Sequence, residues 1–130
     1  MEQRAAGPFK VFLVEDSELL RKRVEGMLAA IPGASMVGHA ADAGSAIRGI
    51  LAGRPDAVVL DIQLSKGSGF DVLRALRERA PEIRVYVLTN FANDAYRQAA
   101  ERLGASGFFD KTNEFERLRD ALAAVSSARL

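Results

Sequence analysis

The hydrophobic residues of this chain follow two alternating patterns. Short apolar runs rich in β-branched residues occupy 11–14, 57–60 and 85–88, and two weaker runs, SMVGHA and SGFFD, occupy 35–40 and 106–110. Continuous apolar runs of this length are typical of strands that are buried on both faces of a parallel sheet. We therefore expect five strands.

Between these runs, apolar residues recur at helical spacing and predict five amphipathic helices. The five apolar stripes are Leu19, Leu20, Val24, Met27, Leu28 and Ile31; Ala43, Ala46, Ile47, Ile50 and Leu51; Phe70, Leu73 and Leu76; Ala95, Tyr96, Ala99 and Leu103; and Phe115, Leu118, Leu122 and Val125. The segments IPGA, GRPD, RAPE and LGAS place proline or glycine where helices should end. Asp42 is well placed to cap the second helix.

Five repeats of strand and helix predict an α/β fold: a doubly wound five-stranded parallel sheet, flavodoxin-like, in the order 2-1-3-4-5, with helices on both faces. In such sheets the functional site lies outside the carboxyl ends of the strands, where the strand order reverses. We expect this domain to span 9–126, with tails at 1–8 and 127–130.

Composition narrows the class of protein. The chain has 130 residues, enough for one core, and its 18 Lys and Arg nearly balance 17 Asp and Glu. This balance gives no reason to expect direct contact with nucleic acid or membrane insertion. The chain has no cysteine, and we see neither a secretory signal nor an apolar stretch long enough to span a membrane. We expect a cytoplasmic protein.

Polar side chains follow four of the five expected strands. Glu15 and Asp16 follow the first, Asp61 the third, Thr89 the fourth and Lys111 the fifth. Because the first and third strands are neighbours at the reversal point, we expect these side chains to share one crevice.

Each residue alone has a simpler explanation. Acids at the start of the first helix gain about 0.3–1 kcal/mol each from the helix dipole, and Lys111 could pair with Asp110. Asp61 fits such an explanation less well, because the loop QLSKGSG follows it before the next helix begins. Accidental placement of all these groups on the appropriate four strands is the weaker explanation.

Three carboxylates in one pocket require a cation, because each pair at ~4 Å repels by ~4 kcal/mol at an effective dielectric of ~20. Oxygen ligands suit Mg²⁺, or Mn²⁺, and the absence of clustered His and Cys argues against zinc. A divalent ion, an ammonium and a hydroxyl beside a carboxylate form a good receptor for a phosphoryl group. Transfer to the carboxylate would yield an acyl phosphate.

Four motifs in order resemble the receiver domain of bacterial two-component response regulators: VFLVEDS, PDAVVLDIQLSKGSGFDVL, VYVLTN and GASGFFDKT. The resemblance covers the chain from about Phe9 to about Val125. It implies a stand-alone, chemotaxis-regulator-like receiver that acts as a phosphorylation switch and catalyses only its own phosphorylation and slow dephosphorylation, with no separate substrate.

The resemblance also implies a role for each matching residue. Asp61 would take a phosphoryl group, as an aspartyl phosphate, from a phosphohistidine on a sensor histidine kinase or histidine phosphotransfer protein. Asp16 would bind Mg²⁺ directly beside Asp61, Glu15 would help to hold its water shell, and the backbone carbonyl of Gln63 would complete the protein ligands.

The remaining roles concern the switch. Thr89 would reach the phosphoryl oxygen and Lys111 would bridge to it, while Phe108 occupies an aromatic position linked to the movement of Thr89. The output would be protein contacts of the fourth helix, fifth strand and fifth helix with an unknown downstream target.

Some positions depart from the family pattern. Thr112 follows the lysine where proline in a cis peptide bond is usual, so we expect no cis bond there. The loop after Asp61 lacks its usual proline. Our hypothesis is that Gln63 and Phe91 shape the access of water to the acyl phosphate and so tune dephosphorylation.

Other readings remain open. The chain could be a receiver-like interaction module that works without phosphorylation, or the receiver fragment of a longer regulator. A small phosphate-handling enzyme comes last, because the sequence has no Gly-rich phosphate loop. Away from the strand ends, we expect His39 to be structural and Tyr96 to belong to the core or a partner surface. We expect solvated helix faces for Arg97, Arg102, Arg117 and Arg119.

Overall fold

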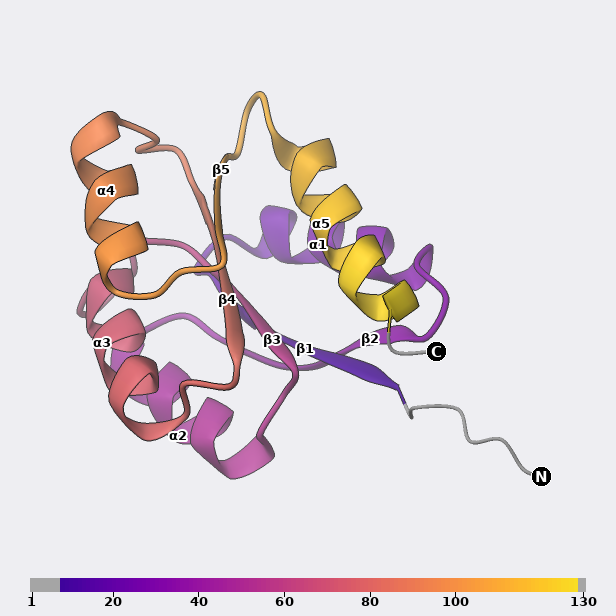
Figure 1. Ribbon diagram of the computed structural model, residues 1–130, viewed down its shortest axis with the longest axis horizontal. Helices are drawn as coiled ribbons and strands as arrows, with labels where there is room; N and C mark the ends of the chain where they lie inside the picture. The colour runs from indigo at the N-terminus through magenta and orange to yellow at the C-terminus, as the bar shows by residue number, and fades with distance from the viewer. Residues whose placement is uncertain (1–7, 129–130) are drawn as a thin grey trace.

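The computed structural model describes residues 8–128, which form a three-layered α/β domain (Figure 1). Its elements are β1 (Phe9–Val14), α1 (Glu18–Ala29), β2 (Ala34–Ala40), α2 (Ala43–Gly53), β3 (Ala57–Leu60), α3 (Gly69–Arg79), β4 (Arg84–Thr89), α4 (Asp94–Arg102), β5 (Gly107–Asp110) and α5 (Phe115–Ala128). The strands pair in parallel in the order β2-β1-β3-β4-β5. The predicted fold class and strand order are therefore confirmed.

Helices cover both faces of the sheet, with α1 and α5 on one face and α2, α3 and α4 on the other (Figure 1). Alternate strand residues enter the two cores. On β3, for example, Val58 and Leu60 pack in the core on the α2–α4 side, whereas Val59 packs on the α1–α5 side. Burial on both faces is the reason why these strands are continuously apolar.

The sheet register brings the carboxyl ends of the strands to one edge. Val14 pairs with Leu60, and Leu60 pairs with Val87. The ladder continues one residue beyond β3, because the Asp61 N–H donates to the carbonyl of Val14, the last residue of β1, at 2.9 Å. Residues that follow the strands therefore emerge beside one another.

Side-chain caps define where the helices at this edge begin. Asp42 accepts a hydrogen bond from the N–H of Ser45 at 2.8 Å, as its position in the sequence predicted. Ser17 caps α1. At α3, Ser68 and Asp71 form a capping box, in which each side chain accepts a backbone hydrogen bond from the other end of the first turn.

Two predicted helix faces differ from the structure. Leu19 is 75% exposed, although the helical spacing of the sequence predicts it in the apolar stripe of the first helix. In α4, Ala100 is the buried residue, whereas Ala95 and Tyr96 are exposed. The cause is that α4 is short and lies beside β5, an edge strand, so that it covers little apolar surface.

The ends of the chain are described only in part. α5 runs to Ala128, and the rest of the two expected tails, 1–7 and 129–130, lies outside the described residues. As expected for Thr112, no cis peptide bond occurs within residues 8–128. No helix in that range is long and apolar enough to cross a membrane.

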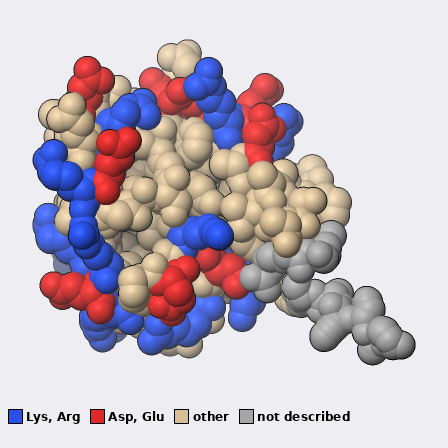
Figure 2. Space-filling view, in the orientation of Figure 1, with Lys and Arg blue, Asp and Glu red and all other residues tan. Residues whose placement is uncertain are grey.

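Charged side chains of both signs are interleaved on the face of the molecule shown in Figure 2. This distribution agrees with the formal net charge of +1. The face in view carries no large patch of a single sign.

Two helical glycines have different surroundings, and this difference yields a test of the packing. A Cβ on Gly49 in α2 would lie 3.0 Å from the ring of Phe12, whereas a Cβ on Gly26 in α1 would meet nothing within 4 Å. We expect Gly26→Ala to raise the free energy of unfolding by up to ~1 kcal/mol, because alanine favours the helix. Gly49→Ala should gain less or destabilise the protein. Urea denaturation followed by circular dichroism checks this, and equal stabilisation by both changes would contradict the packing of Phe12.

Candidate functional site

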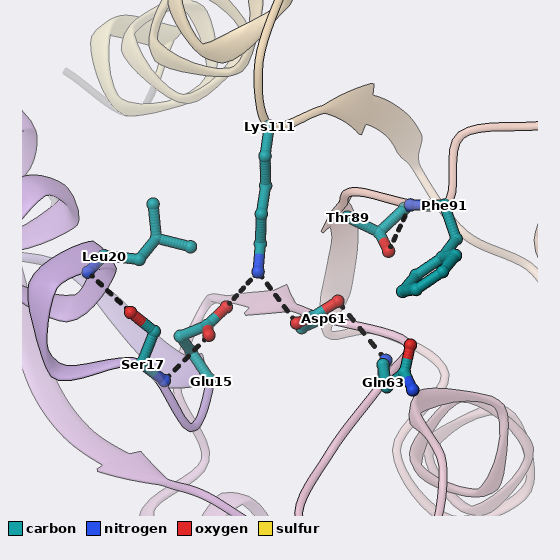
Figure 3. A network of polar contacts seen from close by, with 8 residues as sticks. All are labelled: Glu15, Ser17, Leu20, Asp61, Gln63, Thr89, Phe91 and Lys111. Carbon is teal, nitrogen blue, oxygen red and sulfur yellow. Dashed lines mark hydrogen bonds and ion pairs between the residues drawn. The ribbon is translucent and has the colours of Figure 1, made fainter.

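The ammonium group of Lys111 lies between two buried carboxylates at the carboxyl edge of the sheet (Figure 3). Its Nζ atom is 2.9 Å from Oε1 of Glu15 and 2.9 Å from Oδ2 of Asp61. The simpler pairing of Lys111 with Asp110 is not the one observed: Oδ1 of Asp110 accepts the N–H of Thr112 at 2.7 Å. One lysine thus joins residues that follow β1, β3 and β5.

Backbone hydrogen bonds orient the two carboxylates. The second oxygen of Glu15 accepts the N–H of Ser17 at 2.9 Å. The second oxygen of Asp61 accepts the N–H of Gln63 at 3.3 Å. Each carboxylate therefore contacts Lys111 through one oxygen and the main chain through the other.

Burial and charge act in opposite directions at this cluster. Burial raises the pKa of Glu15, and this effect outweighs the hydrogen bonds from Lys111 and Ser17 that lower it. Burial also acts to lower the pKa of Lys111, but hydrogen bonds to Asp61 and Glu15 and the charges of these acids raise the pKa overall. Lys111 is therefore a cation at neutral pH.

Asp16 is the third acid of the cluster, and it is exposed. Carboxylate oxygens of Glu15, Asp16 and Asp61 lie within 4.8 Å of one another. Three carboxylates outnumber the single ammonium of Lys111, and oxygen atoms are the ligands that Mg²⁺ prefers. The donor set therefore fits a hard divalent cation.

Thr89 and Phe91 border the site on the β4 side. Thr89 is fully buried, and its Oγ1 accepts the N–H of Phe91 at 3.1 Å. The Phe91 side chain is 45% exposed. In the view of Figure 3, Phe91 and Gln63 lie on the same side of Asp61.

The first residue of α3 packs directly against the backbone of Asp61. The N–H of Gly69 donates to the carbonyl of Ile62 at 2.8 Å. A Cβ at position 69 would lie 2.4 Å from the carbonyl oxygen of Asp61, so only glycine fits there. This close approach holds the loop after Asp61 against α3, a contact that the sequence motifs do not indicate.

Phe108 is buried, and its ring is covered by Arg97 from α4. The expectation of a simple solvated helix face was wrong for Arg97, because its guanidinium lies 4.8 Å from the ring centroid and donates to the carbonyl of Phe108 at 3.0 Å. The helical spacing does contain a signal for this contact, because Arg97 precedes the buried Ala100 by three residues and therefore lies on the same side of the helix.

The other candidates lie away from the cluster. His39 is exposed on the edge strand β2. Tyr96 is 38% exposed and meets Phe70 edge-on, with ring centroids 5.6 Å apart. The remaining arginines, Arg102, Arg117 and Arg119, are exposed as expected.

Comparison with known proteins now identifies the family. The model of the response regulator receiver domain matches residues 11–123. The chain belongs to this family. The relationship expected from the four sequence motifs is therefore confirmed.

Individual relatives agree with this assignment. The chain is 36% identical to the DNA-binding transcriptional activator DevR/DosR of Mycobacterium tuberculosis, over 92% of this chain and 55% of that protein. It is 35% identical to the nitrate/nitrite response regulator protein NarP of Escherichia coli, over 92% and 55%. A LuxR-family two-component response regulator from Aurantimonas superposes with a TM-score of 0.85 at 29% identity, over 95% of this chain and 88% of that one.

The chain spans just over half the length of DevR/DosR and NarP. The shared part is the receiver, which acts as a signalling switch in two-component systems. The acidic cluster that the strand ends predicted is present in it.

Removing the shared cation tests how this receiver tolerates its buried charges. Lys111→Met leaves two buried carboxylates without their counter-ion, and we expect the free energy of unfolding at neutral pH to fall by about 3 kcal/mol. Adding Glu15→Gln should recover part of the loss, because one of the two charges is then removed. Urea denaturation in metal-free buffer measures both effects.

The matched control is Lys66→Met, since Lys66 is an exposed lysine in the loop after β3. Equal losses from the two lysine substitutions would show that the ion cluster has no special energetic role.

Proposed function

We propose that this receiver accepts a phosphoryl group on Asp61 from a phosphohistidine of a sensor histidine kinase or histidine phosphotransfer protein. The observation that carries the proposal is the position of the Lys111 ammonium, 2.9 Å from a carboxylate oxygen of Asp61. The exposed carboxylate of Asp16 lies within 4.8 Å of the Asp61 carboxylate. A buried carboxylate held beside a cation can take on further negative charge at lower cost than one without such a partner.

The transfer needs positioning and charge neutralisation. A carboxylate oxygen of Asp61 attacks the phosphorus atom and forms the new P–O bond. The P–N bond to the donor imidazole breaks, and its electron pair returns to that ring nitrogen. Lys111 already contacts Oδ2 of Asp61, so its charge is in place before the phosphoryl group arrives.

Asp16 and Asp61 would hold Mg²⁺, with Glu15 supporting its water shell and the backbone carbonyl of Gln63 as a further ligand. The bound metal would neutralise charge on the phosphoryl oxygens. The oxygen donors of the cluster support this proposal and would also accept Mn²⁺.

Thr89 is suited to respond to the new group. A hydroxyl has one donor and two acceptor positions, and the N–H of Phe91 uses one acceptor position. The donor can then serve a phosphoryl oxygen. Such a contact would draw Thr89 toward Asp61 and carry the β4–α4 connection with it.

The output would be a population shift at the surface formed by α4, β5 and α5. A phosphoryl group adds about −1.5 to −2 charges and strong acceptors, which bias an equilibrium between two arrangements. Phe108 lies on β5 and is buried beneath that surface, so its environment is expected to change with the state of Asp61. A downstream protein would read the altered surface.

Intact-mass measurement with Mg²⁺ and acetyl phosphate tests the proposal. We expect a single phosphoryl adduct on the wild-type chain and none on Asp61→Asn. Asp56→Asn is a control at an aspartate just before β3, at the opposite end of that strand. No adduct on the wild-type chain would favour a module that works without phosphorylation, and turnover of a separate substrate would favour an enzyme.

The lifetime of the acyl phosphate tests the second part of the proposal, that Phe91 and Gln63 limit the access of water. Removing the Phe91 ring should speed dephosphorylation roughly fivefold if it lowers the barrier by ~1 kcal/mol. The decay of phosphorylated Phe91→Ala is compared with wild type after the donor is removed. Val37→Ala is the control, because Val37 is 47% exposed on β2 at the other edge. An unchanged rate in Phe91→Ala would exclude this role.

A further inference from the structure

Arg97 of α4 contacts two other parts of the fold, β5 and the residue before α5. From α4, its guanidinium covers the Phe108 ring on β5 at 4.8 Å and donates to the Phe108 carbonyl at 3.0 Å. Its second terminal nitrogen lies 3.8 Å from Oε1 of Glu114, the residue before α5. One side chain therefore links α4, β5 and the start of α5.

Glu114 connects these contacts to the end of β5. The oxygen that faces Arg97 also accepts the N–H of Asp110 at 3.0 Å. The Arg97 side chain is 38% exposed and the Glu114 side chain 23%, so this ion pair is only partly shielded from water. Asp110 directly precedes Lys111, so the Arg97 contacts end one residue from the phosphoacceptor cluster.

The helix that carries Arg97 has few other contacts with the domain, among them the edge-on contact of Tyr96 with Phe70 of α3. Ala100 is the one buried residue among the described positions of α4. At the C-terminal end of the helix, Arg77 of α3 donates to the carbonyl of Arg102. On the side that faces β5, Arg97 supplies the hydrogen bond, the ring contact and the ion pair described above.

A phosphoryl group on Asp61 would act on residues 108–111 at the Lys111 end, whereas Arg97 contacts the same segment at Phe108. Lys111 divides its ammonium between Glu15 and Asp61. New negative charge on Asp61 would draw the Lys111 ammonium toward the phosphoryl oxygens and weaken its contact with Glu15. Residues 108–111 are consecutive in the chain. Arg97 donates a hydrogen bond to the carbonyl of Phe108 at the start of this segment, and the side chain of Lys111 at its end contacts the acids of the cluster.

We propose that Arg97 is a positioning residue that holds α4, β5 and the start of α5 in their unphosphorylated arrangement and thereby opposes phosphoryl binding at Asp61. The inference rests on the proposed function, because it requires a phosphoryl group at that carboxylate. If the Arg97 contacts belong to one arrangement, their removal favours the other and raises the affinity of the ligand that selects it.

Beryllofluoride with Mg²⁺ is a suitable probe, because it binds a carboxylate oxygen reversibly in the place of a phosphoryl group and no acyl phosphate is formed that could hydrolyse. Its dissociation constant is measured by fluorine NMR for wild type, Arg97→Ala and Arg97→Lys. We expect Arg97→Ala to bind about fivefold more tightly than wild type. Arg97→Lys should lie between them, because it keeps the charge but loses the planar group that covers Phe108.

The matched control is Arg102→Ala, which removes an exposed arginine from the same helix and should leave the affinity unchanged. Thermal unfolding without beryllofluoride establishes that each variant is folded. If Arg97→Ala does not fold, Arg97→Lys and Glu114→Gln decide the question, and both should bind more tightly than wild type.

Two results overturn the proposal in distinguishable ways. Beryllofluoride binding to wild type with equal or weaker binding to the Arg97 variants shows that Arg97 has only a structural role, and the proposed function stands. Failure of the wild-type protein to bind beryllofluoride with Mg²⁺ overturns this inference together with phosphoacceptance at Asp61.

Discussion

The ion cluster of Lys111, Glu15 and Asp61 is the interaction on which the organisation of this receiver depends. It joins the ends of strands that are not all neighbours, since β4 lies between β3 and β5. Removing such charges from water costs several kcal/mol for each ion, which their mutual attraction repays only in good geometry. The complete cluster therefore adds little net stability, whereas removal of Lys111 alone would leave two buried carboxylates without their counter-ion. Its role in the structure is to hold the residues after β1, β3 and β5 together at one edge of the sheet.

The surroundings of the cluster differ in how firmly they are held. On the α3 side, Gly69 lies so close to the Asp61 carbonyl that no Cβ fits between them, and a capping box secures the first turn of the helix. The backbone of Asp61 therefore belongs to a closely packed junction between β3 and α3. Such packing restricts movement of the main chain that carries the Asp61 carboxylate.

The α4 side is built differently. Its buried apolar contact is small, and polar contacts of Arg97 take the place of a larger core. Polar contacts can be exchanged for others at modest net cost, whereas a packed apolar face must move as a unit. The domain thus combines a closely packed α3 side with an α4 side that is attached chiefly through polar contacts.

The sequence alone determined the strands, their order and the residues at their ends, because burial on both faces imposes a local pattern that can be read along the chain. It also indicated the three acids, since charges that interrupt an apolar strand must leave the core at its end. The partner of Lys111 was decided only by the tertiary structure: Asp110 is adjacent in sequence, yet the bonds go to Asp61, 50 residues away, and to Glu15. The exposed Leu19 and the covered Phe108 were decided in the same way. The physical reason is that a side chain's contacts depend on which elements pack against it, and spacing along the chain specifies a helix face but not what that face meets.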